Sequence, residues 1–223
     1  MADPDAKPIV AVFDFDGTIT YVDSFLPFLR HIAGFFGFWF GMVRLSPVMV
    51  MHAAGVMKNW QAKERFLGTF LKGRIIDELA EPCAEFNRQR LQLLINPIAM
   101  EKVEWHRREG HRLILLSASP ELYLRHWTEA NGFEKVLGTR LAEAQGQISG
   151  KIEGNNCHGV EKIDRLRDEL GDLSQYEIHS YGDSRSDKPL LNLVDHPGYR
   201  SFEGGSKLGY KLIGLTRFLR TLL

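Results

Sequence analysis

The sequence predicts an α/β protein, built on a doubly wound parallel sheet with an inserted α-helical cap. Apolar β-type runs alternate with amphipathic helical segments along the chain, which is the order that produces a parallel sheet. The predicted strands end in polar residues, namely Asp14 and Asp16, Ser117, and Asp183. A long helical region, about residues 21–97, separates the first strand from the second. Because the carboxyl ends of parallel strands meet at one edge, we expect the functional groups there.

The composition sets limits on the class of protein. The chain has 223 residues, 44% of them hydrophobic, which is enough for one core with an insertion. Lys and Arg balance Asp and Glu at 28 each, and this zero net charge argues against a nucleic-acid partner. The two cysteines, Cys83 and Cys157, lack metal-type spacing, and the first residues lack the pattern of a signal peptide. We therefore expect a cytoplasmic protein.

The first predicted strand ends in two carboxylates, Asp14 and Asp16, within the stretch from Val10 to Thr18. Side chains two residues apart on a strand project to the same side, so both acids should share one small site. Like charges that close repel each other unless a cation, a proton or a phosphoryl group intervenes. The pair therefore predicts a chemical site rather than a packing arrangement.

The other elements follow from apolar periodicity and from turn residues such as Gly110 and Pro120. In order, the sequence predicts helices over Arg74–Ile95 and Ala99–Glu109, a strand over Arg112–Leu116, a helix over Glu121–Ala130, a strand over Lys135–Gly138, a hairpin within residues 139–152, a helix over Val160–Leu170, a strand over Tyr176–Tyr181 and a helix over Pro189–Val194. We divide the chain into a catalytic core of residues 1–20 and 98–206, a helical cap of residues 21–97, and a basic amphipathic helix of residues 207–223.

Four motifs in this order resemble those of the haloacid dehalogenase superfamily of phosphatases. They are Asp-x-Asp-Gly-Thr from Asp14, an apolar strand ending in Ser117, Lys162 at the start of a helix, and Gly-Asp-x-x-x-Asp from Gly182 to Asp187. The stretch around Ser117 and the helical insertion resemble the branch that contains phosphoserine phosphatases and bacterial phosphatidylglycerophosphate phosphatases.

The resemblance implies a role for each motif residue. Asp14 would be the nucleophile and Asp16 the general acid and base. Ser117 and Lys162 would hold the phosphoryl oxygens, with Thr18 and Ala118 as further substrate-binding candidates. Mg²⁺ would be held by Asp14, the backbone carbonyl of Asp16, and Asp183, with Asp187 in or beside its coordination shell.

The residue types suit this chemistry. A hard divalent cation touching both a carboxylate and a phosphate lowers their repulsion and orients the attack. Each residue alone has a plainer interpretation: a lone aspartate at a strand end is commonly a turn former or helix cap, Lys162 could be a solvated helix lysine, and Ser117 could cap a helix. The series of motifs, rather than any single residue, carries the prediction.

The insertion and the C-terminus raise the question of a membrane partner. Residues 32–51 approach the length of a membrane span, but Arg44 and Pro47 near the middle make a lone transmembrane helix costly. A surface-lying or re-entrant hairpin and a cap packed over the sheet remain equal alternatives. Leucines at helical spacing among basic residues in 207–223 suit either an anionic membrane surface or docking on the protein itself.

Several cap residues have two interpretations. Asp23 could grip a substrate amine, as in phosphoserine phosphatases, but we favour a helix cap. Arg44, Lys63 and Arg65 are candidates for contact with a second anionic group. The eight histidines, His158 and His179 among them, show no metal-ligand spacing and are expected to be structural or exposed.

The sequence thus predicts a Mg²⁺-dependent phosphomonoester hydrolase, and the preferred substrate is a phospholipid phosphate such as phosphatidylglycerophosphate at the inner face of the membrane. A soluble metabolite such as phosphoserine is the alternative substrate. A catalytically quiet binding module is the alternative of another class. The oligomeric state stays open.

Overall fold

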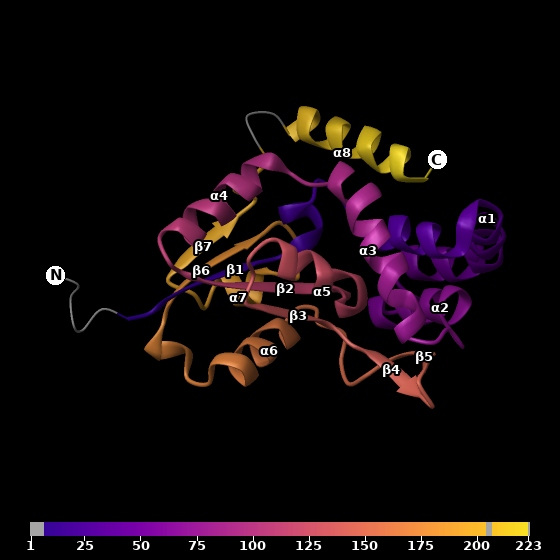
Figure 1. The fold of residues 1–223 in the computed structure, drawn as a ribbon, viewed down its shortest axis with the longest axis horizontal. Helices are drawn as coiled ribbons and strands as arrows, with labels where there is room; N and C mark the ends of the chain where they lie inside the picture. Colours follow the sequence, from indigo (N-terminus) through magenta and orange to yellow (C-terminus); the bar gives the residue numbers. More distant parts are fainter. Residues whose placement is uncertain (1–6, 204–206, 223) are drawn as a thin grey trace.

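A five-stranded parallel sheet forms the centre of the protein in the computed structural model, which describes residues 7–203 and 207–222 (Figure 1). Its strand order is β3-β2-β1-β6-β7. The strands are β1 (Ile9–Phe13), β2 (Arg112–Pro120), β3 (Lys135–Thr139), β6 (Glu177–Gly182) and β7 (His196–Tyr199). The predicted α/β fold with a parallel sheet is confirmed.

Helices cover both faces of this sheet, because each central strand is apolar on both sides. Ala11 and Phe13 of β1 pack with the residues of α4 (Pro97–Arg108) and α5 (Glu121–Ala130). Val10 and Val12 face the other way and pack with residues of α6 (Glu161–Leu170) and α7 (Lys188–Leu191). The sheet is therefore doubly wound.

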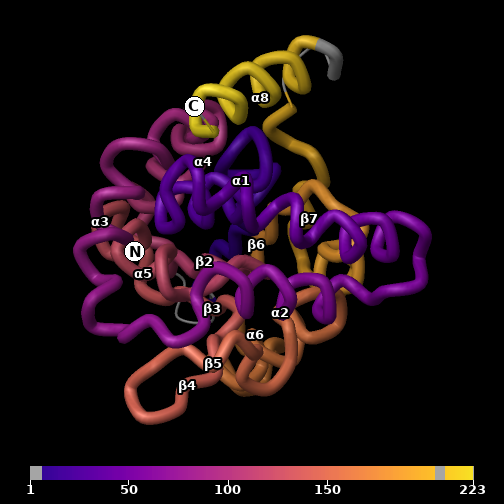
Figure 2. The backbone as a smooth tube through the Cα atoms, turned by 90° about the vertical axis from the view of Figure 1, so that its right-hand side faces the viewer, coloured from indigo at the N-terminus to yellow at the C-terminus, as the bar shows by residue number. Residues whose placement is uncertain are grey.

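The cap consists of α1 (Phe25–Ala53), α2 (Asn59–Phe70) and α3 (Ala80–Gln89), and it lies in front of the sheet in Figure 2. The α1 helix is kinked at Gly34, whose φ of 70° is not helical. Glycine adopts this conformation without the strain that a side chain would cause. Lys63 of α2 reaches the core, where its Nζ donates to the Ala118 carbonyl at 2.7 Å. The cap therefore touches the carboxyl end of β2.

The continuous helix predicted over Arg74–Ile95 is wrong. The segment forms two 3₁₀ turns, Asp77–Leu79 and Leu91–Leu93, on either side of α3. Contacts distant in sequence occupy its backbone groups: the Ile76 N–H donates to the Gly146 carbonyl, and the Leu94 carbonyl accepts from the Tyr21 N–H. Tertiary hydrogen bonds replaced helical ones at both ends.

Two β elements differ in how well the sequence predicted them. The hairpin is confirmed as β4 (Leu141–Ala144) and β5 (Gln147–Ile152), and it packs against α2 of the cap. The edge strand β7 was not predicted, because it has four residues, including Pro197 and Gly198, which local patterns do not identify as a strand. Pro is tolerated there because the outer side of an edge strand has no partner.

The C-terminal helix α8 (Lys207–Leu222) is confirmed as a helix, and it lies along the top of both views (Figures 1 and 2). It docks through polar contacts. The Arg217 guanidinium donates to the Leu93 carbonyl at 3.0 Å, and the Tyr210 hydroxyl donates to the Gly17 carbonyl at 2.9 Å. Its leucines Leu212, Leu215 and Leu219 are exposed instead of packed.

Candidate active site

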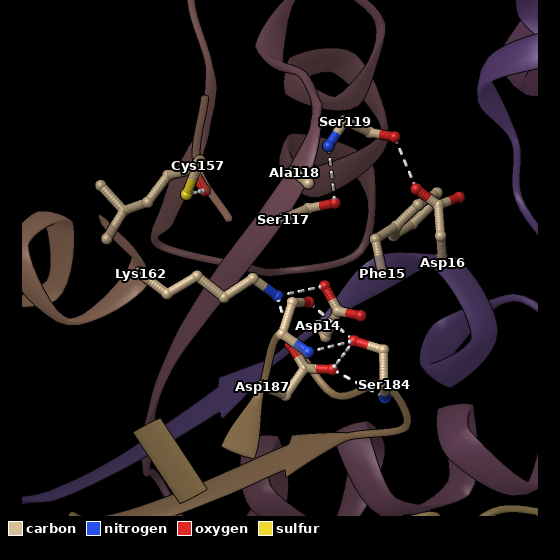
Figure 3. Close-up of polar contacts among 12 residues, drawn as sticks. Asp14, Phe15, Asp16, Ser117, Ala118, Ser119, Cys157, Lys162, Ser184 and Asp187 are labelled. Atoms are coloured by element: carbon tan, nitrogen blue, oxygen red, sulfur yellow. Dashed lines mark hydrogen bonds and ion pairs between the residues drawn. The ribbon is translucent and has the colours of Figure 1, made fainter. Parts of the chain in front are cut away.

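A buried lysine joins acids from two separate strands at the carboxyl edge of the sheet (Figure 3). Lys162, in the first turn of α6, donates through Nζ to Asp14 Oδ1 at 2.7 Å and to Asp187 Oδ1 at 2.6 Å. Asp14 directly follows β1, and Asp187 follows the loop after β6. Because Lys162 is 2% exposed, each of these ion pairs is shielded from water.

Three carboxylates at this edge outnumber the one lysine. Oxygen atoms of Asp14, Asp183 and Asp187 all lie within 4.8 Å of one another. The Asp183 Oδ1 atom is buried and has no hydrogen-bond partner among the described residues. Gly17 allows the Asp183 carboxylate to approach, since a Cβ at residue 17 would collide with it. An unbonded buried oxygen in an all-oxygen donor set suits a hard cation such as Mg²⁺.

Burial makes these negative charges costly. It raises the pKa of Asp14 to about 7, with Asp187 and Asp16 adding to the rise and Lys162 opposing it. Burial also raises the pKa of Asp183 to about 7, with Asp14, Asp187 and Asp16 adding to that rise. Three carboxylates beside one lysine therefore leave uncompensated negative charge once Asp14 and Asp183 ionise, which happens at and above about pH 7.

This excess of charge predicts a pH-dependent effect of Mg²⁺ on stability. The pKa values of Asp14 and Asp183 lie above 3.8 in the folded state, so the folded protein binds more protons than the unfolded chain and loses stability as the pH rises from about 4 to about 7. Mg²⁺ should therefore raise the melting temperature more at about pH 8 than at about pH 5. Thermal unfolding with and without Mg²⁺ at both pH values checks this. The variant Asp183→Asn should lose the rise in melting temperature that Mg²⁺ causes. An equal rise at both pH values would contradict it.

Asp16 points away from the lysine and toward the cap side of the site (Figure 3). Its carboxylate accepts hydrogen bonds from the Ser24 N–H at 2.7 Å, the Ser24 hydroxyl at 2.6 Å and the Ser119 hydroxyl at 2.5 Å. The Ser24 hydroxyl also bonds the Tyr123 hydroxyl. Burial raises the pKa of Asp16 to about 6, and nearby Asp23 adds to the rise. A carboxyl group poised near neutrality can both give and take a proton.

Sequence reasoning missed the serines that hold Asp16. Ser119 follows Ser117 by two residues in the stretch Ser-Ala-Ser, and this spacing was the available signal that both serines face the same site. Ser24 offered none, because its contact with Asp16 depends on the turn after β1. Ser117 itself is buried, and its Oγ accepts from the Ser119 N–H at 3.1 Å.

A cavity of about 310 Å³ opens beside these groups. Its walls combine core and cap. The lining residues are Asp14, Asp16, Asp23, Phe25, Leu26, His52, Asn59, Ala62, Lys63, Phe66, Ser117, Ala118, Ser119, His158, Lys162, Ser184 and Ser186. Both residues of the first acid pair, together with Ser117, Ala118 and Lys162, thus face one space.

Asp23 and Lys63 are the charged cap-side groups of this cavity. The Asp23 carboxylate accepts the Phe25 N–H at 2.9 Å and so caps the start of α1, as favoured from the sequence. Lys63 Nζ also donates to the Asn156 side chain at 2.8 Å. Burial lowers the pKa of Lys63, while Asp23 and Asp16 raise it.

Five candidates from the sequence do not line the cavity. Asp183 and Asp187 belong to the carboxylate cluster with Asp14, and the other three are Thr18, Arg44 and Arg65. Thr18 is buried beneath the site, and its hydroxyl has no hydrogen-bond partner among the described residues. Arg44 and Arg65 are exposed and do not line the cavity. They were singled out by charge alone, which carries no information about the direction in which a helix face points.

Sequence comparisons agree with this geometry. The family model for haloacid dehalogenase-like hydrolases matches residues 11–192. Protein CicA of Caulobacter vibrioides is 32% identical over 200 residues, which cover 89% of this chain and 88% of that protein. A histidinol-phosphatase of Neisseria meningitidis is 29% identical over 127 residues, covering 54% of this chain and 57% of that enzyme.

Solved structures share the fold. A protein of unknown function from Bordetella pertussis Tohama I has a TM-score of 0.76 at 26% identity, covering 85% of this chain and 88% of that one. A substrate-bound phosphoserine phosphatase has a TM-score of 0.56 at 16% identity, covering 84% and 83%, and supports the fold alone. The family match spans every strand-end acid described above, and the chain belongs to the haloacid dehalogenase-like hydrolases.

Proposed function

We propose that this hydrolase is a Mg²⁺-dependent phosphatase, which hydrolyses phosphate monoesters through an aspartyl phosphate on Asp14. The observation that carries the proposal is the meeting of Asp14, Asp183 and Asp187 around Lys162, with a buried Asp183 oxygen left unbonded among the described residues. A bound Mg²⁺, held by those carboxylates, would offset the repulsion between Asp14 and the phosphate.

The residues then divide the chemistry into two steps. In the first, an Asp14 oxygen attacks phosphorus and the bond to the ester oxygen breaks, while Asp16 gives its proton to the departing alkoxide. In the second, Asp16 takes a proton from water, the resulting hydroxide attacks phosphorus, and Asp14 is released with inorganic phosphate. A raised pKa, about 6 for Asp16, suits a group that serves as acid and then as base.

Lys162 and the residues at the carboxyl end of β2 stabilise the negative charge of the phosphoryl group. The Lys162 ammonium lies beside the nucleophile, where it also opposes the negative charge of phosphoryl oxygens. Ser117 and Ala118 line the same cavity and offer donors to those oxygens. The cap closes the space from the other side and limits the access of bulk water.

The preferred substrate is a phospholipid phosphate at the cytoplasmic surface of a membrane, and α1 supports this choice. Its exposed face carries Phe36, Phe40, Val43 and Val50, with exposures of 85%, 75%, 73% and 68%. Their spacing places them along one face of the helix, and large exposed apolar patches commonly mark interaction surfaces.

The α1 helix also belongs to the cavity wall. Phe25 and Leu26 at its start and His52 at its end line the cavity. By length and hydropathy α1 is the one helix among the described residues that could span a membrane, and only 17% of its apolar window is buried in the protein. The kink at Gly34 and the charge of Arg44 favour a helix lying at the membrane surface over one that crosses it.

The α8 helix offers a second contact with an anionic membrane. Leu212, Leu215 and Leu219 are exposed beside Lys211 and Arg220, which are exposed as well. Each basic residue near an anionic surface contributes about 1 kcal/mol. α8 contacts α1 within the folded protein, since the Arg30 guanidinium donates to the Leu222 carbonyl at 3.1 Å.

A soluble phosphate ester that carries an amine is the second candidate substrate. Asp23 lines the cavity, and relatives include a histidinol-phosphatase. The Asp23 carboxylate already accepts the Phe25 N–H, so capping the start of α1 is the role that its observed contact supports. For this reason we place the lipid phosphate ahead of the amine.

Parallel assays separate these substrates. We expect hydrolysis of an aryl phosphate and of phosphatidylglycerophosphate in anionic vesicles, both stopped by chelation and restored by Mg²⁺. The double variant Phe36→Ser with Phe40→Ser should lose vesicle binding and lipid hydrolysis by about tenfold or more, because two large apolar side chains no longer enter the lipid. Its hydrolysis of the aryl phosphate should be unchanged.

The control is Leu193→Ser, an exposed leucine outside α1 and α8, which should behave as the unaltered protein. Equal vesicle binding by the double variant would contradict the membrane part of the proposal. Faster hydrolysis of phosphoserine than of the lipid would favour the second candidate. Hydrolysis that survives chelation would remove the metal from the mechanism.

A further inference from the structure

A cluster of histidines lies at the end of the sheet opposite the active site. His106 of α4, His111 after α4, His179 of β6 and His196 of β7 have neighbouring rings, and Glu177 of β6 lies among them. The His179 and His196 rings stack with their centres 4.2 Å apart. Sequence reasoning found no metal-ligand spacing here, because these residues come from three separate segments.

Strand register explains why the three residues on β6 and β7 meet. Glu177 and His179 are two residues apart on β6 and so project to the same face. His196 is the register partner of His179 on the parallel neighbour β7. The His196 Nε2 atom lies 2.8 Å from Glu177 Oε1, and the His179 Nε2 atom lies 3.7 Å from the same oxygen.

These three side chains offer the donor set of a transition-metal site. One ligand atom from each of Glu177, His179 and His196 lies within 4.8 Å of the other two. Two imidazole nitrogens and a carboxylate oxygen, completed by water, are a donor set that Zn²⁺ takes in proteins. We propose that Glu177, His179 and His196 bind a Zn²⁺-class ion.

Burial and access suit such an ion. The His179 side chain is 16% exposed and His196 is 51% exposed, so one ligand is held in place while the other is open to solvent. The other two histidines have different partners: His106 Nδ1 lies 2.7 Å from His111 Nδ1, and His106 Nε2 lies 2.9 Å from the Tyr181 hydroxyl. Their rings pack against the ring of His179, and they are not part of the ligand set.

The proposed site is distinct from the catalytic one in place and in chemistry. His179 lies in β6 and Asp183 directly follows that strand, so the two are four residues apart, roughly 13 Å in an extended chain. The catalytic cluster offers carboxylates, which suit Mg²⁺, whereas imidazole favours Zn²⁺ and its neighbours in the transition series. Mg²⁺ in excess should therefore fill the first site and leave the second to Zn²⁺.

The ion would join the edge strand β7 to its neighbour β6. The β7 strand has four residues, and β6 is its one strand partner in the described sheet. Binding to the folded state alone raises its stability. We expect Zn²⁺ to raise the melting temperature of the protein even when Mg²⁺ is already saturating.

Metal titration of the full chain tests the site. With Mg²⁺ in excess, equilibrium dialysis should find one tightly bound Zn²⁺ per chain. His196→Ala should weaken that binding by at least about tenfold, because removing a residue that merely hydrogen-bonds a metal ligand already costs about that much affinity. The matched control is His126→Ala, an exposed histidine on α5, which should bind Zn²⁺ normally. Cu²⁺ bound in place of Zn²⁺ should show couplings to two nitrogens in its electron paramagnetic resonance spectrum, and His196→Ala should leave the coupling to one nitrogen at most.

Folding is checked without metal. His196 is half exposed, so its replacement should leave the metal-free melting temperature unchanged, and Glu177→Gln provides a second variant that keeps both imidazoles. If both variants bind Zn²⁺ as tightly as His126→Ala, the proposal is overturned. Absence of a tight Zn²⁺ ion in the unaltered protein would overturn it equally. Neither result would affect the hydrolysis assigned to Asp14, because the aryl phosphate assay with Mg²⁺ reads the other site.

Discussion

Asp14→Asn should abolish phosphate-ester hydrolysis, with a loss of roughly 10⁴-fold or more, the scale expected when a covalent nucleophile is removed. The amide keeps the shape of the side chain but lacks the carboxylate oxygen that attacks phosphorus. The variant should fold, because burial already makes the charge of Asp14 costly. Initial rates on an aryl phosphate with Mg²⁺, together with acid-quench trapping of the phosphoenzyme, measure the loss.

The control for this change is Asp164→Asn, an exposed acid on α6 two residues from Lys162. It makes the same chemical change near the site without touching the cavity, so its rate should equal that of the unaltered protein. Asp14→Asn turnover close to that of Asp164→Asn, or a phosphoenzyme that still forms, would show that another residue is the nucleophile.

Asp16→Asn should lower the rate by about 10²–10⁴-fold on an alkyl phosphate, the contribution of a positioned acid and base. The loss in the first step should be smaller on p-nitrophenyl phosphate, because that leaving group departs without a proton. Loss of the base should then slow hydrolysis of the aspartyl phosphate, so the aryl substrate should give a burst followed by slow turnover. Rapid-quench kinetics with both substrates resolve the two steps.

The comparison between substrates separates a proton-transfer role from a structural one. Asp16 also accepts three hydrogen bonds from Ser24 and Ser119, and losing them could disturb the site. A disturbed site would slow both substrates alike and would show no burst. Equal losses in the first step on alkyl and aryl phosphates, with no burst on the aryl substrate, would therefore contradict the role of Asp16 as acid and base.

Local signals predicted much of the fold. The helix over Glu121–Ala130 is confirmed at both ends, since Pro120 begins it and Asn131-Gly132 end it, and both signals act within a few residues. The Arg74–Ile95 helix failed because its backbone bonds to Gly146 and Tyr21, which are distant in sequence. The β7 strand was missed for the same reason: its evidence is its partner β6 rather than its own residues.

The sequence by itself determined which acids follow which strands, and from their order the family and the type of reaction. Tertiary structure alone decided how those groups are used. It pairs Lys162 with Asp14 and Asp187, turns Asp16 toward Ser24 and Ser119, and leaves Thr18 outside the cavity. The physical reason is that a side chain's partners are set by strand register and by the packing of cap on core, and these bring together residues more than 100 positions apart, as between Asp16 and Ser119.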